Sequence, residues 1–206
     1  MLLLLTKAEG TLMRYPHPNL GRLVQPRHYD NMAATVRNGR PWAADNDCFQ
    51  GLDAQAYRRM LQTIPAGGVF VTVPDVVGDH RATARRWSRW SGYVRRLGHR
   101  PAFVLQDGCD RWGQVPEGAD AVFIGGTTGY KLSATAAELV REANARGMWT
   151  HMGRVNTRRR IRYAKSIGCK SVDGTAFAKF TDAHIGWGLA ECAASTQMRL
   201  QPEDAA

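Results

Sequence analysis

Short apolar runs recur along the chain, and each is followed by polar or glycine residues. A run of this kind, bounded by turn-forming residues, predicts a β-strand. The later runs are continuously apolar rather than alternating, which is typical of parallel strands buried on both faces. The predicted strands are 2–5, 21–24, 41–45, 69–75, 101–107, 121–126, 149–153 and 170–174.

Longer segments with apolar residues at helical spacing lie between the later strands, and they predict helices over 53–64, 79–98, 133–147 and 157–168. This alternation predicts an α/β fold with a parallel sheet, and eight strands fit a compact (β/α)8 TIM-like barrel made by one domain, residues 1–206. A doubly wound open sheet is the alternative, but no G-x-G-x-x-G follows the first strand. The first two strands have no obvious helix between them, which leaves an irregular barrel open. We expect the tail from about residue 195 to be frayed.

In a barrel, the residues that follow the strands meet at one rim. The positions at the ends of the predicted strands are Asp45, Asp75, Gln106, Gly125, Gly126, Gly153 and Asp173. Each acid taken alone could instead cap a helix or shape a turn. Together they suit a guanine-like base, whose N–H groups donate to carboxylates and whose carbonyl accepts from an amide. A further carboxylate beside the sugar would act as nucleophile or general acid in breaking a glycosidic bond.

The chain carries a formal net charge of +10 and has a pI near 10.0. This balance favours a polyanionic partner, with nucleic acid ahead of a membrane surface. Arginines are concentrated in 81–100 and 154–165, although an ordinary solvated helix face is the alternative for the first segment. The residues that we expect to contact phosphates are Arg154, Arg158, Arg159 and, as a weaker candidate, Lys131.

The remaining composition excludes several classes of protein. The apolar start, "MLLLL", is too short to span a bilayer and lacks the features of a secretory signal, so we expect an intracellular, cytoplasmic protein with no membrane partner. The four cysteines are scattered with no C-x-x-C pair, which predicts neither a metal site nor a redox motif. We therefore expect no metal and no cofactor.

Five motifs follow one another in the order found in one enzyme family. They are "DNDCFQ" (45–50), "FVTVPDVVGD" (70–79), "AFVLQDG" (102–108), "AVFIGGTTGYK" (121–131) and "HMGRVNTRRRIRYAKSIGCKSVDG" (151–174). The first resembles a D-S-G-G-F-Q block, the third a V-Q-G strand and the fourth a G-G-L-A-V-G segment. The chain thereby resembles the tRNA-guanine transglycosylases, and more specifically their phage and bacterial relatives that insert 7-deazaguanine bases into DNA.

The resemblance implies a role for each of the strand-end residues. Asp173 would be the nucleophile that forms a glycosyl–enzyme intermediate, and Asp45 would be the acid/base. Asp75 and Gln106 would read the purine edge, and Gly125 and Gly126 would supply backbone contacts. The implied partners are DNA, with tRNA less favoured, and a free purine or 7-deazapurine base. The target nucleotide would be flipped out of the duplex.

Two departures from the family pattern keep alternatives open. The family's C-x-C-x-x-C…H zinc cluster is absent after Asp173, and Asn46 and Asp47 replace small residues. A DNA glycosylase that leaves an abasic site is the second enzyme reading, and a non-catalytic nucleic-acid-binding barrel is the third. His151, near a strand end, is interpreted as a packed or supporting residue rather than an acid/base. The oligomeric state is left open.

Overall fold

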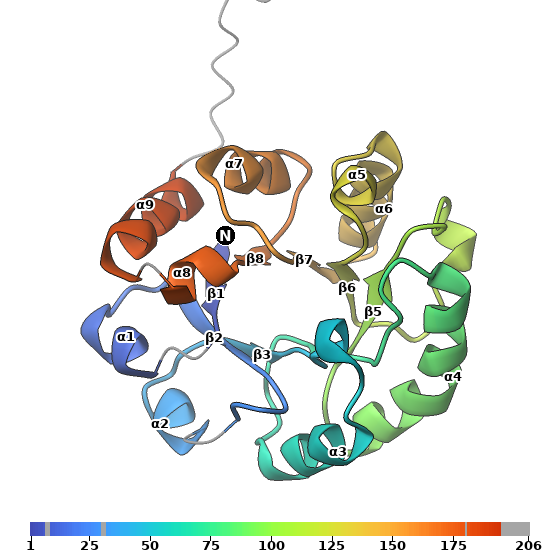
Figure 1. Ribbon diagram of the computed structural model, residues 1–206, viewed down its shortest axis with the longest axis horizontal. Helices are drawn as coiled ribbons and strands as arrows, with labels where there is room; N and C mark the ends of the chain where they lie inside the picture. The colour runs from blue at the N-terminus through green and yellow to red at the C-terminus, as the bar shows by residue number, and fades with distance from the viewer. Residues whose placement is uncertain (7–8, 30–31, 180, 195–206) are drawn as a thin grey trace, which may run out of the picture.

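The computed structural model describes residues 1–6, 9–29, 32–179 and 181–194, and within them eight strands close into a parallel barrel in the order of the sequence. Figure 1 looks along this barrel, with the helices forming a ring outside the strands. The predicted α/β fold with a TIM-like barrel is confirmed. The strands are β1 (Leu2–Leu5), β2 (Leu20–Val24), β3 (Trp42–Ala44), β4 (Val71–Thr72), β5 (Pro101–Leu105), β6 (Ala121–Ile124), β7 (Trp149–Met152) and β8 (Ser171–Asp173).

Four helices match the predicted segments, and each begins after a polar residue that caps it. The side chains of Asp53, Asp79, Ser133 and Thr157 accept hydrogen bonds from backbone N–H groups in the first turn of the helix that follows. Such a cap satisfies donors that have no partner inside the helix. These helices are α3 (Ala54–Thr63), α4 (His80–Arg96), α6 (Ala134–Ala145) and α7 (Arg158–Ser166).

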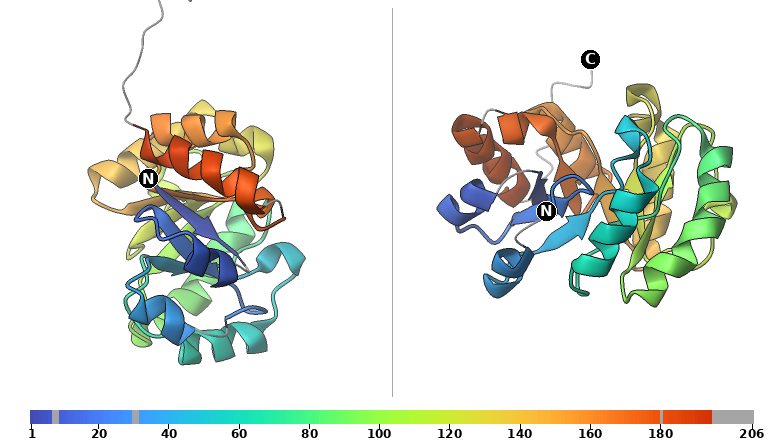
Figure 2. Two further views of the ribbon diagram at one scale, coloured as in Figure 1. Left: turned by 90° about the vertical axis from the view of Figure 1, so that its left-hand side faces the viewer. Right: turned by 60° about the horizontal axis from the view of Figure 1, so that its bottom comes forward.

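The structure also contains helices that the sequence pattern did not indicate. One of them, α1, lies between the first two strands and makes the start of the barrel regular (Figure 2). The irregular alternative is therefore wrong. The additional elements are α1 (Glu9–Arg14), α2 (Met32–Arg37), α5 (Thr128–Lys131), α8 (Thr175–Lys179), α9 (Thr181–Ala193) and the 3-10 helices η1 (Cys48–Gln50) and η2 (Trp112–Gln114). The predicted frayed tail, from about 195, lies outside the described residues.

Side chains alternate between the two faces of each strand, so the barrel has two apolar layers. The inner layer contains Leu4, Leu23, Ala43, Phe70, Ala102 and Ala121. The outer layer packs the opposite faces of the strands against the helices and includes Leu3, Leu5, Val24, Phe103 and Ile124. The inner layer fills much of the barrel below the carboxyl ends of the strands, and the rim at those ends is where a ligand could enter.

The barrel closes where the first and last strands pair. Leu4 is the register partner of Asp173, and Leu3 is that of Val172. Gly21 faces the interior at the next strand, and a Cβ built there would lie 2.4 Å from the Pro41 carbonyl oxygen. Close approach of neighbouring backbones therefore requires glycine at this position. Within the described residues, no helix is both long and apolar enough to cross a membrane.

Candidate active site

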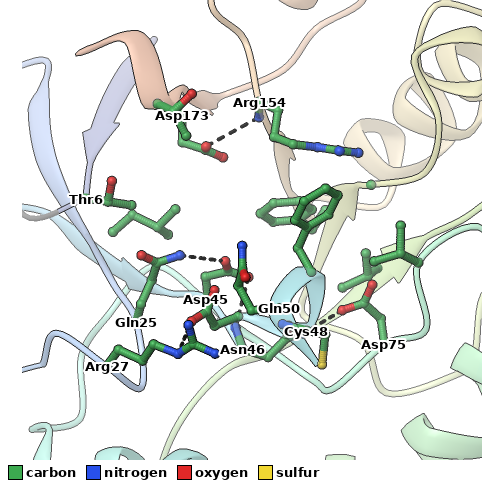
Figure 3. A pocket seen from close by; sticks show the side chains of 18 of the residues that line it. Thr6, Gln25, Arg27, Asp45, Asn46, Cys48, Gln50, Asp75, Arg154 and Asp173 are labelled. Carbon is green, nitrogen blue, oxygen red and sulfur yellow. Dashed lines mark hydrogen bonds and ion pairs between the residues drawn. The ribbon is translucent and has the colours of Figure 1, made fainter. Parts of the chain in front are cut away.

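A pocket of about 660 Å³ opens at the carboxyl ends of the strands (Figure 3). It contains all six residues for which the sequence predicts a catalytic or base-binding role: Asp45, Asp75, Gln106, Gly125, Gly126 and Asp173. The strand ends thus bring together residues that are up to 128 positions apart, since 173 − 45 = 128. Further polar lining comes from Thr6, Gln25, Arg27, His28, Asn46, Asp47, Gln50, Arg154, Thr175 and Lys179.

Asp45 follows β3 and is held from two sides. Its Oδ1 accepts from the backbone N–H of Asn46 at 2.9 Å and from the hydroxyl of Thr72 at 3.3 Å, and its Oδ2 accepts from Gln25 Nε2 at 3.3 Å. Burial, together with the charges of Asp173 and Asp75, raises the pKa of Asp45 to about 7. A carboxyl group in this state can both give and take a proton at neutral pH, which is what a general acid/base requires.

Asp75 is the centre of a buried hydrogen-bond network. Asn46 Nδ2 donates to its Oδ1 at 2.8 Å, Gln106 Nε2 donates to its Oδ2, and Arg86 donates to its backbone carbonyl. Burial raises the pKa of Asp75, although the two amide donors act against that rise. Gln106 also accepts from the backbone N–H of Gly78 at 2.8 Å. Both polar atoms of the Gln106 amide are therefore engaged within the protein, so this residue orients Asp75 in addition to lining the pocket.

Asp173 ends β8 and is bound by the strand next to it. Its Oδ2 lies 2.9 Å from His151 Nε2, and its Oδ1 accepts from the backbone N–H of Arg154 at 3.3 Å. His151 is fully buried, and its Nδ1 lies 2.8 Å from the Ser171 hydroxyl. His151 is therefore a packed residue that supports Asp173, as the sequence predicted.

Gly125 and Gly126 follow β6 and leave their backbone open to the pocket. A Cβ at Gly125 would lie 2.7 Å from Gln106 Nε2, and one at Gly126 would lie 2.6 Å from an Asp107 carboxylate oxygen. Gly126 also has a φ of 71°, in the left-handed region where glycine is favoured. Any side chain here would displace the amide that orients Asp75 or the Asp107 carboxylate that receives the Thr127 N–H at 2.8 Å.

Arg154 and Phe49 meet across the mouth of the pocket. The Arg154 guanidinium lies 4.9 Å from the centre of the Phe49 ring and donates to the Gly126 carbonyl, while its backbone has a φ of 58°. This left-handed conformation costs a non-glycine residue about 1–2 kcal/mol. Phe49 is 63% exposed, which is unusual for a phenylalanine. Figure 3 shows Arg154 and Asp173 on one side of the pocket and Asp45 on the other.

The other predicted phosphate contacts lie away from the pocket. Lys131 is buried, and its Nζ donates to the Gly153 carbonyl at 2.9 Å, while burial lowers its pKa to about 8. The Arg158 guanidinium lies over the Trp187 ring and 3.8 Å from Glu191, so it faces α9. Arg159 is exposed on α7 but does not line the pocket. The prediction is corrected accordingly: Arg154 is at the mouth, whereas Lys131 and Arg158 are held elsewhere.

Several residues of the site were missed from the sequence. Gln25 and Arg27 follow β2, and they were missed because no acid ends that strand. Arg27 Nε lies 3.2 Å from the Asp47 carboxylate. Asn46 and Phe49 lie in the "DNDCFQ" block but were not assigned roles. Exposure of an aromatic residue cannot be read from its sequence neighbours, so only the geometry places Phe49 at the mouth.

Comparisons with known proteins identify the fold only. The sequence matches no family model, and no curated protein matches it. Deoxyribose phosphate aldolase from Aeropyrum pernix is structurally similar, with a TM-score of 0.57 and 12% identity over 86% of each chain. An HpcH/HpaI aldolase from Desulfitobacterium hafniense has a TM-score of 0.56 and 11% identity over 92% of each chain. For 3-hexulose-6-phosphate synthase from Salmonella typhimurium the TM-score is 0.56, with 13% identity over 93% of this chain and 96% of that one. All three likenesses are those of a shared TIM barrel.

Proposed function

We propose that this protein is a DNA base-exchanging enzyme, which cleaves the N-glycosidic bond of guanine through a covalent intermediate on Asp173 and inserts a 7-deazaguanine base. One observation carries the proposal: three carboxyl groups from different strands share one pocket, and one of them, Asp45, has a pKa raised to about 7. Pairs of carboxyl groups with unequal proton affinities are the recurrent means of cleaving glycosidic bonds.

The chemistry assigns one step to each acid. An Asp173 oxygen attacks C1′, the C1′–N9 bond breaks, and the electron pair leaves with the purine. Asp45 gives its proton to a ring nitrogen of the purine, so the base departs neutral. In the second half, N9 of the incoming base attacks C1′ and expels the Asp173 carboxylate, while the proton on that nitrogen passes to Asp45. Asp45 is thereby returned to its protonated state.

The wall of the pocket suits a base that presents adjacent N–H groups. Asp75 is held by amide donors from Asn46 and Gln106, which leaves its remaining lone pairs for the N1–H and exocyclic amine of guanine. The Gly125 N–H donates to the Leu105 carbonyl at 2.9 Å, so we assign the contact with the purine carbonyl to the Gly126 N–H. The volume of about 660 Å³ is within the range of small-molecule sites and admits a flipped nucleotide.

The charge distribution supports DNA as the partner. The chain carries +10 overall, and Arg27, Arg154 and Lys179 line the pocket, where phosphates beside a flipped nucleotide would lie. The aldolase neighbours offer a rival chemistry, because a Schiff-base mechanism needs a lysine amine within the site. Lys179 lines the pocket and is the lysine for that alternative, whereas the buried Lys131 donates to Gly153 and is not part of the pocket. The carboxyl groups of Asp45, Asp75 and Asp173 in the same pocket favour glycosidic-bond chemistry instead.

The test is incubation of the protein with duplex DNA and a radiolabelled guanine or 7-deazaguanine base. Label should enter the DNA, and a protein–DNA adduct should survive denaturation and map to the peptide that contains Asp173. Asp173→Asn should abolish both signals, whereas Glu117→Gln, at an exposed acid that does not line the pocket, should leave them unchanged.

Three results would contradict the proposal. Release of free base with an abasic product, and no uptake of label, would indicate a glycosylase. Incorporation of the labelled base into tRNA but not into DNA would show that the substrate is RNA. Neither uptake nor adduct in the unmodified protein would leave only a nucleic-acid-binding barrel.

A further inference from the structure

A column of polar side chains runs through the barrel's interior and ends on Asp173. Trp149 Nε1 donates to the Ser171 hydroxyl at 2.8 Å, Ser171 Oγ lies 2.8 Å from His151 Nδ1, and His151 Nε2 lies 2.9 Å from Asp173 Oδ2. The layer around it is otherwise apolar, with the Phe123 ring 4.6 Å and the Phe70 ring 5.2 Å from that of His151. Buried polar groups in such surroundings are costly unless all are satisfied.

The order of donors and acceptors determines where the protons lie. An indole N–H can only donate, so Ser171 Oγ accepts from Trp149. Ser171 Oγ has a second lone pair, but if it accepted from both rings its own proton would have no acceptor among the hydrogen bonds of the described residues. The arrangement that satisfies every group has Ser171 donating to His151 Nδ1, with the histidine proton on Nε2. That proton points at Asp173 Oδ2. The column thus presents an N–H donor to one oxygen of the Asp173 carboxylate.

The two oxygens of Asp173 are consequently different. Oδ2 is occupied by the imidazole, whereas the one hydrogen bond that Oδ1 receives from the described part of the chain is the longer, 3.3 Å contact from the Arg154 backbone. We infer that His151 is a positioning residue, which fixes the carboxylate of Asp173 through Oδ2 so that Oδ1 is the oxygen that attacks C1′. Ser171 and Trp149 serve this role by holding the imidazole in the Nε2–H form.

This inference rests on the proposed function for its catalytic part but not for its structural part. A cationic histidine would pull electron density from the attacking carboxylate, and a histidine protonated on Nδ1 would leave Oδ2 without its donor. A carboxylate free to rotate would meet C1′ in the right orientation less often, and misplacement by about 1 Å can cost about 100-fold in rate.

The catalytic test compares two replacements of His151 in the full chain. Glutamine can place an N–H near the position of Nε2, whereas leucine fills the apolar space and donates nothing. We expect His151→Leu to slow formation of the covalent adduct about 100-fold with little change in KM for DNA, and His151→Gln to recover most of that rate. Equal rates for the two variants, or a change confined to KM, would overturn the positioning role.

The structural test needs no activity. In protein labelled with 15N-histidine, two-bond proton–nitrogen correlation at pH 7 should show His151 protonated on Nε2 and unprotonated on Nδ1. Asp173→Asn should shift the Nε2–H proton upfield, because a neutral amide is a weaker acceptor than a carboxylate. Ser171→Ala should reduce the Nε2–H population, because it removes the hydroxyl whose proton His151 Nδ1 accepts.

The outcomes separate the two proposals. An imidazolium, or a proton on Nδ1, in the unmodified protein would overturn the inference even if base exchange occurs. If the unmodified protein forms no adduct with either nucleic acid, the catalytic assignment falls together with the proposed function. The NMR result then decides whether the column holds the carboxylate of Asp173 as described.

Discussion

Replacement of Asp45 by asparagine should stabilise the protein at neutral and alkaline pH while abolishing base exchange. The pKa of Asp45 is raised from 3.8 to about 7, mainly by burial and then by the charges of Asp173 and Asp75. A shift of about three units corresponds to about 4 kcal/mol when the carboxyl is fully ionised. Because Asp45 is only partly buried as a residue, solvent screening reduces this to about 2–4 kcal/mol.

The direction of the pH dependence of the free energy of unfolding follows from how many protons the folded and unfolded states bind. Between pH 4 and pH 7 the folded protein keeps a proton on Asp45 that the unfolded chain releases, so the free energy of unfolding falls as the pH rises. An asparagine never ionises and shows no such fall. The substitution also alters the hydrogen bonds from Asn46 and Gln25, but that contribution to the free energy of unfolding does not change with pH. The variant's advantage should therefore be absent near pH 4 and reach about 2–4 kcal/mol by pH 8.

Urea unfolding at 25 °C, measured from pH 4 to pH 8, gives the difference in the free energy of unfolding between the two proteins. Glu117→Gln is the matched control, because Glu117 is exposed, and its difference should stay near zero throughout. A difference between Asp45→Asn and the unmodified protein that does not change with pH would refute the reasoning. It would mean that Asp45 ionises as it does in the unfolded chain.

The fold and the mouth of the pocket yield two further predictions. Gly21→Ala should lower the free energy of unfolding by about 3 kcal/mol or more in urea, because its Cβ would lie 2.4 Å from the Pro41 carbonyl oxygen; a loss under 1 kcal/mol would contradict this close approach. Arg154→Ala should lower the salt dependence of DNA binding by about one unit of slope. Arg158→Ala should not, because that side chain faces Glu191, and equal effects of the two would argue against the placement of Arg154 at the mouth.

The strands and the convergence of the acids could be predicted because both depend on local patterns. Continuous apolar runs mark buried parallel strands, and an acid at the end of such a run has only the rim available to it. This is why Asp45, Asp75 and Asp173 could be placed in one pocket before any coordinates. The four helices predicted from helical spacing likewise begin at the residues that cap α3, α4, α6 and α7 in the structure.

Helix α9 was missed because its sequence opposes its structure. Gly186 and Gly188 lie inside it, and each lowers helix propensity by about 1 kcal/mol relative to alanine. Gly188 is nevertheless required, since a Cβ there would lie 2.7 Å from Phe177 Cε1. Tertiary packing has overridden the local preference, and a pattern along the chain does not contain that packing.

The internal hydrogen bonds of the site were equally out of reach. The sequence indicates that Gln106 lies at a strand end, but not that both polar atoms of its amide are engaged by Asp75 and Gly78. Partners of this kind come from loops brought together only when the barrel closes. The link from His151 to Asp173 depends instead on the register of β7 with β8, which the sequence does not show.

The barrel closes only when its first strand, β1, pairs with its last strand, β8. Asp173 is in register with Leu4, so the proposed nucleophile is held partly by a strand that lies 169 positions earlier in the chain, since 173 − 4 = 169. The whole segment between these two strands must therefore be synthesised before this carboxylate has its neighbours. A circular permutant, in which the chain is opened in a loop between a strand and a helix and its original ends are joined, would test whether the β1–β8 pairing tolerates a change of chain order.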